Sequence, residues 1–199
     1  RGLGDVYKRQ PVVELVNNRE REYIFADLPD IGYSTDIDTV MASSYQVKKQ
    51  LQQIVKIEQP ITNTLLYKRI LRIWNLTRVT TRLQVFIDNL LEDAYKDPLS
   101  GDTIIYWEDE EKAKDCDFYR INSKRDILDI PILEVMSAAR YAIEQQISMP
   151  TEDLKRLTSQ LLGFSRKGNN LDMVTEQTIQ LLIDQGIFSH ANGMVSMNN

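Results

Sequence analysis

Apolar residues recur with the period of an α-helix through most of the chain after residue 40. The clearest face is formed by four residues spaced four, three and four positions apart, Val79, Leu83, Phe86 and Leu90. Positions with this spacing share one side of a helix, so the pattern predicts a helix over 78–93 with this side in the core. The same reasoning predicts further helices over 40–56, 62–74, 131–147, 151–162 and 171–185.

Residues that commonly begin or end helices stand at the limits of these segments. Pro60 stops the first of them, and Thr62 is a suitable N-cap for the second. Asn75 and Gly163 each follow a predicted helix, at the place where a residue in the left-handed conformation commonly closes one. Thr151 is the expected N-cap of the helix that Gly163 ends.

Two segments between the helices, Thr103–Trp107 and Phe118–Ile121, have the β-branched and aromatic residues typical of strands. The stretch between them, EDEEKAKDCD, is too polar to be packed. We therefore predict a hairpin from Thr103 to Ile121 with a long mobile tip, which would form a wing. Asn192-Gly193 is a typical two-residue hairpin turn and predicts a second, short hairpin whose final strand is MVSM.

The order helix, Pro break, capped helix, basic turn, helix and hairpin therefore occurs twice. It is the order of a winged helix. It predicts a mainly α fold with small β-hairpins, built as tandem winged-helix-like domains (helix-turn-helix plus wing) over 40–123 and 124–199. The preceding residues, 11–39, contain Pro29, Gly32 and several aspartates and predict a linker.

The first ten residues, RGLGDVYKRQ, carry neither a phosphate-loop pattern nor an apolar period. A transposon-end adaptor used in sequencing libraries encodes this same string, so we interpret residues 1–10 as an artefact and exclude them from the fold. We then expect a C-terminal fragment, with 11–39 as the linker from missing upstream domains. The alternative for the apolar patch Val12–Val16 is the last strand or helix of such a domain.

Composition narrows the class of protein further. Hydrophobic residues make up 42% and charged residues 27% of the 199 residues, as in a globular chain. The 24 Lys and Arg against 29 Asp and Glu give a net charge of −5, which excludes the basic type that coats nucleic acid indiscriminately. A single cysteine permits no internal disulfide and favours a cytoplasmic location. No apolar run approaches the roughly 18 residues that span a bilayer, so we expect no membrane contact.

No pattern of catalytic or metal-binding residues stands out. The GxxxxGK[ST] phosphate loop is absent. The only histidine, His190, cannot form a His/Cys metal cluster or a triad with Cys116, and we interpret both as surface loop residues. The acidic run Glu108–Glu111 lacks the patterned Gly of a calcium loop and is interpreted as solvated charge. We therefore expect no enzyme activity, cofactor, metal or small-molecule substrate for this chain.

A local group of basic residues is the one feature of the sequence that indicates a function. Between Gln59 and Ile87 the chain has no acidic residue but five basic ones, Lys68, Arg69, Arg72, Arg78 and Arg82. On the predicted helix Arg78, Arg82 and Gln84 lie away from the apolar face, where a recognition helix presents groups to a DNA groove or backbone. A second basic group falls at the corresponding position of the second half: Lys155, Arg156, Arg166 and Lys167. The alternatives are a solvated face and a surface for an acidic partner.

The segment Ile54–Trp74 resembles a C-terminal module of unknown function in very large bacterial superfamily-one helicase proteins. The family pattern is a Glu-x-Pro-Ile turn, a helix ending in a Leu-Trp/Leu-Gly type motif and a basic turn, which read here as Glu58, Pro60, Ile61, Ile73, Trp74, Asn75, Arg78 and Arg82. Later matches are Trp107, Arg125, Ile130-Pro131 with Glu134, and Leu161–Gly168. Asn75 stands where the family commonly has glycine, and Asn tolerates the same left-handed conformation. The resemblance covers roughly Val40 to the C-terminus, and none of its motifs is catalytic.

The resemblance implies a parent protein with an ATP-dependent helicase domain, often with a restriction-endonuclease-like domain of the very-short-patch-repair type just before this module. ATP hydrolysis and cleavage would belong to those domains. We therefore expect a non-catalytic accessory module whose partners are DNA and the upstream helicase and nuclease domains of the same polypeptide. The alternatives are a protein-interaction or autoregulatory module that docks on the parent motor or nuclease domain, and an independent transcription regulator.

Overall fold

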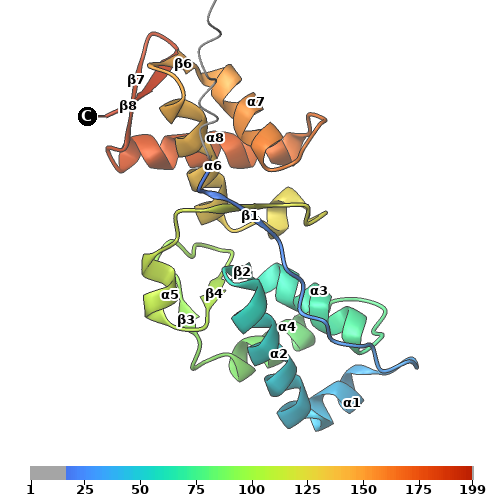
Figure 1. Ribbon diagram of the computed structural model, residues 1–199. Coiled ribbons are helices and arrows are strands. Elements are labelled where there is room, and N and C mark those ends of the chain that lie inside the picture. The colour runs from blue at the N-terminus through green and yellow to red at the C-terminus, as the bar shows by residue number, and fades with distance from the viewer. Residues whose placement is uncertain (1–16, 199) are drawn as a thin grey trace, which may run out of the picture.

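The computed structural model describes residues 17–198 and is mainly helical, with small sheets (Figure 1). Its helices are α1 Ile37–Ala42, α2 Ser44–Glu58, α3 Asn63–Ile73, α4 Thr81–Leu90, α5 Glu110–Lys114, the 3-10 helix η1 Ile127–Asp129, α6 Ile132–Glu144, α7 Thr151–Leu161 and α8 Asn169–Asp184. Its strands are β1 Glu20–Glu22, β2 Ile61–Thr62, β3 Tyr95–Lys96, β4 Ile105–Trp107, β5 Tyr119–Ile121, β6 Met149–Pro150, β7 Phe188–Ala191 and β8 Met194–Met197. The interpretations of residues 1–10 and of Val12–Val16 concern positions outside the described residues.

Most of the predicted helix ends are confirmed. The Thr62 side chain accepts a hydrogen bond from the backbone N–H of Leu65 and so caps α3. Asn75 and Gly163 have φ angles of 51° and 89°, the left-handed conformation expected after a helix. The prediction for Thr151 is wrong, because the preceding proline takes the N-cap position and Thr151 is the first residue of α7.

The helix with the clearest apolar face is also confirmed, although it begins three residues later than the predicted 78. Thr80 caps α4 by accepting a hydrogen bond from the backbone N–H of Leu83, and this fixes the later start. Leu83 is fully buried, while Val79, Phe86 and Leu90 pack partly buried against the same core. The predicted helix over 40–56 is two helices, α1 and α2, separated at Ser43.

Two parts of the chain repeat one order of elements. The first unit, 44–107, runs α2, β2, α3, α4, β3 and β4, and its sheet has the strand order β2-β4-β3. The second unit, 132–197, runs α6, β6, α7, α8, β7 and β8, with the strand order β6-β8-β7. All strand pairs in these two sheets are antiparallel. Figure 1 shows the two units one above the other, with β1 passing between them.

The two predicted hairpins have opposite outcomes. The turn at Asn192-Gly193 joins β7 to β8, with positive φ at both residues, as the sequence predicts. The hairpin over Thr103–Ile121 is wrong, because β4 pairs with β2 and β3 whereas β5 pairs in parallel with β1. The charged stretch between β4 and β5 contains α5, whose N-cap is Asp109. The hairpin of the first unit is instead β3–β4.

Residues 17–39, for which the sequence predicts a linker, lie against the rest of the molecule. Tyr23 and Ala26 are buried with the core of the first unit. The turn between β3 and β4 also reaches across the molecule, because Leu99 packs against the core of the second unit. These contacts hold the two units together as neighbours; the predicted boundary between 123 and 124 stays a prediction.

Candidate nucleic-acid interface

The turn between α3 and α4 carries two exposed arginines. Arg72 lies in the last turn of α3, and Arg78 lies in the segment just before Thr80, the N-cap of α4. Within residues 17–198 neither side chain has an ion-pair partner. Arg72 lines a cleft of about 410 Å³ together with Asp27 and Asp30, so acidic groups lie near it. In the first unit, these two arginines are the predicted basic residues that are both exposed and without an ion-pair partner in the described residues.

Two further residues of the first unit are exposed but paired. The Arg82 guanidinium lies 2.8 Å from the Asp38 carboxylate, and both side chains are more than half exposed. The Lys68 ammonium group lies 2.6 Å from the Asp129 carboxylate of η1, which is buried. Gln84, also predicted to face a ligand, is half-buried. A pair that remains exposed to water can exchange its partner for a phosphate at small cost, so Arg82 stays a candidate.

Arg69 is largely buried, although its side chain, 12% exposed, is among those that line the cleft beside Arg72. Its guanidinium lies 2.8 Å from the Glu58 carboxylate, which is fully buried, and it also donates to the carbonyl oxygen of Ala26. Local sequence does not reveal this pair, because Glu58 is eleven positions away, at the end of the preceding helix α2. The two side chains meet only in the folded chain. Removing Arg69 from its partner would leave a buried carboxylate unpaired, so we exclude it from the candidate interface.

The second unit also has one buried cation among its predicted site residues. The Lys155 ammonium group lies 2.7 Å from the Asp172 carboxylate and 3.3 Å from those of Glu152 and Glu176, and its side chain is only 8% exposed. Burial opposes the charge of Lys155, but the hydrogen bonds to these carboxylates outweigh it and raise its pKa. The neighbouring Arg156 forms an exposed pair with Asp153 at 3.1 Å.

The turn between α7 and α8 corresponds to the turn between α3 and α4. It carries Arg166 and Lys167, both exposed and without an ion-pair partner in the described part of the chain. The helix after it differs from α4, because α8 has three acidic residues and no basic one. Of the second basic group, Arg166 and Lys167 are therefore exposed and lie in a turn, whereas Arg156 is exposed but paired.

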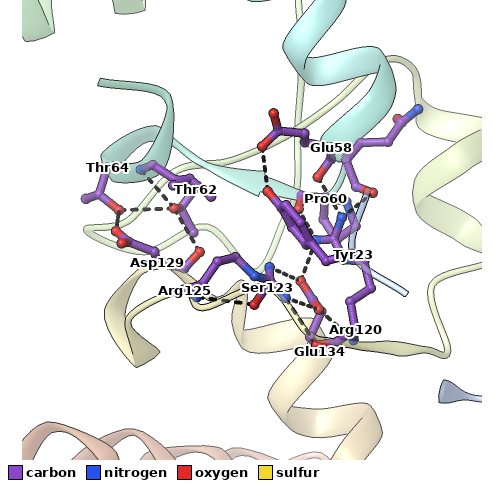
Figure 2. A network of polar contacts seen from close by, with 12 residues as sticks. Tyr23, Glu58, Pro60, Thr62, Thr64, Arg120, Ser123, Arg125, Asp129 and Glu134 are labelled. Atoms are coloured by element: carbon purple, nitrogen blue, oxygen red, sulfur yellow. Dashed lines mark hydrogen bonds and ion pairs between the residues drawn. The ribbon is translucent and has the colours of Figure 1, made fainter. Parts of the chain in front are cut away.

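A cluster of charged residues is buried where the two units meet (Figure 2). Glu134 of α6 is fully buried, and Arg125 donates to both of its carboxylate oxygens at 2.7 and 2.8 Å. Arg120 of β5 pairs with the same carboxylate and also donates to the carbonyl oxygens of Glu58 and Pro60 at 2.7 and 2.6 Å. The arginines thus connect the first helix of the second unit to the end of α2.

Tyr23 closes this cluster from the N-terminal side. The guanidinium groups of Arg120 and Arg125 stack on its ring, 4.7 and 4.2 Å from the ring centre. Its hydroxyl donates to the Glu58 carboxylate at 2.6 Å. Burial and the Glu58 charge raise the pKa of Tyr23, which keeps the phenol protonated as a donor. We call Tyr23, Glu58, Arg120, Arg125 and Glu134 the junction cluster.

The junction cluster is a structural feature, since Arg120 and Arg125 pair with Glu134 and Tyr23 donates to Glu58. Among the described residues, the buried Nε atoms of the two arginines have no hydrogen-bond partner. Burial opposes the ionisation of Glu134, but the charges of Arg120 and Arg125 outweigh burial and lower its pKa. The motifs of the resemblance stated above include Glu58, Arg125 and Glu134. That resemblance was the available signal for the cluster, because the residues are far apart along the chain and no spacing rule connects them.

No described group of side chains is arranged for metal or nucleophile chemistry. Residues 17–198 contain no cluster of three or more His, Cys, Asp or Glu placed to hold a metal ion. His190 is exposed, but it lies in β7 and not in a loop. Cys116 is half-buried and packs against the cluster of Ile105, Trp107 and Phe118, which corrects its interpretation as a surface residue. Burial raises the pKa of the Cys116 thiol to about 12, the opposite of an activated nucleophile.

One comparison with known proteins gives a match. Residues 42–85, from the end of α1 into α4, are similar to a family described as a protein of unknown function (DUF3320). No curated protein and no solved structure matches the chain. The match includes the basic turn between α3 and α4 and gives it no activity. In the described residues no helix has the length and the apolar character needed to cross a membrane.

Proposed function

We propose that this chain is a non-catalytic accessory module that contacts DNA through the turn between α3 and α4. In this proposal the module belongs to a larger superfamily-one helicase and nuclease-type protein, in whose other domains ATP hydrolysis and cleavage take place. The parent architecture rests on the resemblance of Ile54–Trp74 to the C-terminal module of superfamily-one helicase proteins. The contact with DNA rests on the position and charge of Arg72, Arg78 and Arg82.

The order of elements supports an assignment of both units as winged-helix-like. Each has a helix, a short strand, two helices and a hairpin, and in each the short strand pairs with the second strand of the hairpin. In a winged helix the third helix is the one that enters a DNA groove, and α4 holds this place in the first unit. Arg82 and the exposed Thr81 stand in the first turn of α4.

The observation that carries the proposal is the turn ahead of α4, which contains no acidic residue of its own and carries two exposed arginines without an ion-pair partner among residues 17–198. Arg72 and Arg78 flank it, and backbone N–H groups at the start of a helix favour a phosphate. Contacts of this kind fix a protein on the DNA backbone without reading bases. Arg69 and Lys155 leave the predicted set because each is held by carboxylates in the fold.

Charge reversal at the turn tests the proposal. We expect Arg72→Glu with Arg78→Glu to lower the affinity for a fluorescent DNA duplex about tenfold or more at low salt. The slope of log K against log salt concentration should become shallower by about 2, since each lost phosphate contact removes about 0.9. Fluorescence anisotropy over a salt series measures both quantities.

A matched control reverses two exposed lysines of α5, Lys112→Glu with Lys114→Glu, which changes net charge by the same amount. It should bind like the wild type. Wild-type protein that fails to bind duplex DNA with a salt-dependent affinity would contradict the proposal. So would an equal loss in the control variant.

One observation favours a protein-interaction or autoregulatory module as the second candidate. The N-terminal segment exposes Ile24, Phe25 and Tyr33, and Tyr45 of α2 is also exposed. In this alternative the segment docks on the parent motor or nuclease domain. Complex formation with separately purified upstream domains, in a chain that does not bind DNA, would favour it over the first proposal.

A further inference from the structure

We propose that the DNA-binding surface extends beyond the first unit along one edge formed by three turns, so that a single duplex contacts both units. This inference rests on the proposed function. The three turns are the α3–α4 turn with Arg78, the β5–η1 turn with Lys124, and the α7–α8 turn with Arg166 and Lys167. We call them the basic edge. In Figure 1 all three project toward the right side of the molecule.

The β5–η1 turn and the α7–α8 turn adjoin each other. Together they line a cavity of about 390 Å³, to which the first contributes Lys124 and Arg125 and the second contributes Gly163 and Phe164. The β5–η1 turn belongs to the connection between the units, and the α7–α8 turn belongs to the second unit. A ligand at this cavity would therefore lie against the second unit and its connection to the first.

The first unit lies beside this connection as well. Thr62 donates a hydrogen bond to the backbone carbonyl oxygen of Asp129 in η1, and Thr64 donates to the Asp129 carboxylate, with which Lys68 forms its ion pair. These contacts hold α3 against η1, which follows directly after the β5–η1 turn. Helix α3 contacts η1, and the β5–η1 turn adjoins the α7–α8 turn. These contacts connect the elements that carry the three turns.

The basic edge has an excess of accessible positive charge. Arg78, Lys124, Arg166 and Lys167 are exposed, and within residues 17–198 none of them has an ion-pair partner. Acidic residues also lie in or beside these turns: Asp126 caps η1, Glu22 accepts hydrogen bonds from Asn122 in the β5–η1 turn, and Asp172 in the first turn of α8 pairs with Lys155. The chain as a whole has a net charge of −5, so this local excess of positive charge differs from the average of the chain.

The chemistry of the edge fits a phosphate backbone and not base recognition. Its members are long cationic side chains in turns, and the helix after the last turn, α8, is acidic and carries no basic residue. A turn can reach a phosphate without the following helix entering a groove. The second unit would therefore add backbone contacts and affinity, while any base reading would belong to α4 of the first unit.

The test reverses the part of the edge that lies outside the first unit. We expect Lys124→Glu with Arg166→Glu and Lys167→Glu to weaken binding of a duplex of about three helical turns roughly tenfold, and to make the salt slope shallower by about 3. The control reverses three exposed lysines of β3 and α5, Lys96, Lys112 and Lys114, with the same change in net charge. Figure 1 shows β3 and α5 on the left side of the molecule. Circular dichroism checks that both variants are folded.

The outcomes separate this inference from the proposed function. Loss of affinity in the edge variant, with binding retained by the control, supports the extended surface. A second outcome is that the edge variant binds with wild-type affinity and salt slope while Arg72→Glu with Arg78→Glu abolishes binding. This outcome overturns the extended surface and leaves the proposed function standing. Wild-type protein that does not bind DNA overturns both. An equal loss in the control overturns the extended surface in favour of an effect of net charge.

Discussion

The two units use the same order of elements but carry different charges on the helix that follows the basic turn. In the first unit α4 begins with Thr81 and Arg82 and has one acidic residue, Asp88, which accepts hydrogen bonds from Tyr67. In the second unit α8 carries Asp172, Glu176 and Asp184 and no cation. The same order of elements thus carries a helix with a basic residue in its first turn in one unit and a helix with only acidic charges in the other.

The middle helices of the two units show a second contrast. Each contains a cation whose side chain is largely buried, Arg69 on α3 and Lys155 on α7. The carboxylate that holds Arg69 is fully buried, whereas the three that hold Lys155 are each more than 60% exposed. Accessibility of the partner, and not the presence of a pair, decides how much such an interaction contributes to stability.

The largest effect is expected where the two units meet, at Glu134. Glu134→Gln removes the charge that compensates Arg120 and Arg125, and two buried guanidinium groups are then left without a counter-ion. We expect a loss of about 3–5 kcal/mol in the free energy of unfolding. Urea denaturation measures it, with Glu111→Gln on the exposed surface of α5 as the control.

The pH dependence of this loss follows from the lowered pKa of Glu134. A carboxylate with a lowered folded pKa contributes fully above its unfolded pKa of about 4.3, and its contribution disappears as the pH falls through the folded value. The difference between wild type and Glu134→Gln should stay constant from neutral pH to about pH 5 and shrink in stronger acid. A constant difference down to pH 2 would contradict the ionic role of Glu134.

A smaller effect is expected inside the first unit. Arg69→Met keeps much of the side-chain volume but leaves the Glu58 carboxylate with only Tyr23 and the Ala26 N–H as partners. We expect a loss of about 3 kcal/mol in the free energy of unfolding, with little change at high salt because the pair is shielded from water. Arg72→Met on the exposed side of the same helix is the matched control and should be near neutral. Equal losses in both variants would remove the distinction between buried and accessible arginines.

Local chemistry explains which parts of the fold could be predicted from the sequence. Thr62, Asn75, Gly163 and the Asn192-Gly193 turn act on neighbouring backbone atoms, so the residue type and its place in the pattern were sufficient. The apolar face of α4 was predictable for the same reason. Mainly helical structure with small sheets is accordingly confirmed.

The errors concern partners that are distant along the chain. The two segments predicted to pair as one hairpin belong to different sheets, because β5 finds its partner in β1 and β4 finds its partners in β2 and β3. Arg69 and Lys155 look like surface cations in a helical pattern, yet the carboxylate that holds Arg69 and two of the three that hold Lys155 come from other helices. Strand pairing and ion pairing at long range depend on the folded arrangement, which a local pattern does not contain.

The smallest effect is expected inside the second unit, at Lys155. Lys155→Met removes a cation whose three carboxylate partners face water, so we expect a loss of only about 1 kcal/mol in the free energy of unfolding. Salt screens the remaining repulsion among Glu152, Asp172 and Glu176, and the loss should therefore decrease in 1 M salt. Urea denaturation at low and high salt measures it, with Lys167→Met as the exposed control. A loss as large as that of Arg69→Met, unchanged by salt, would mean that the two cations are equivalent despite the different exposure of their partners.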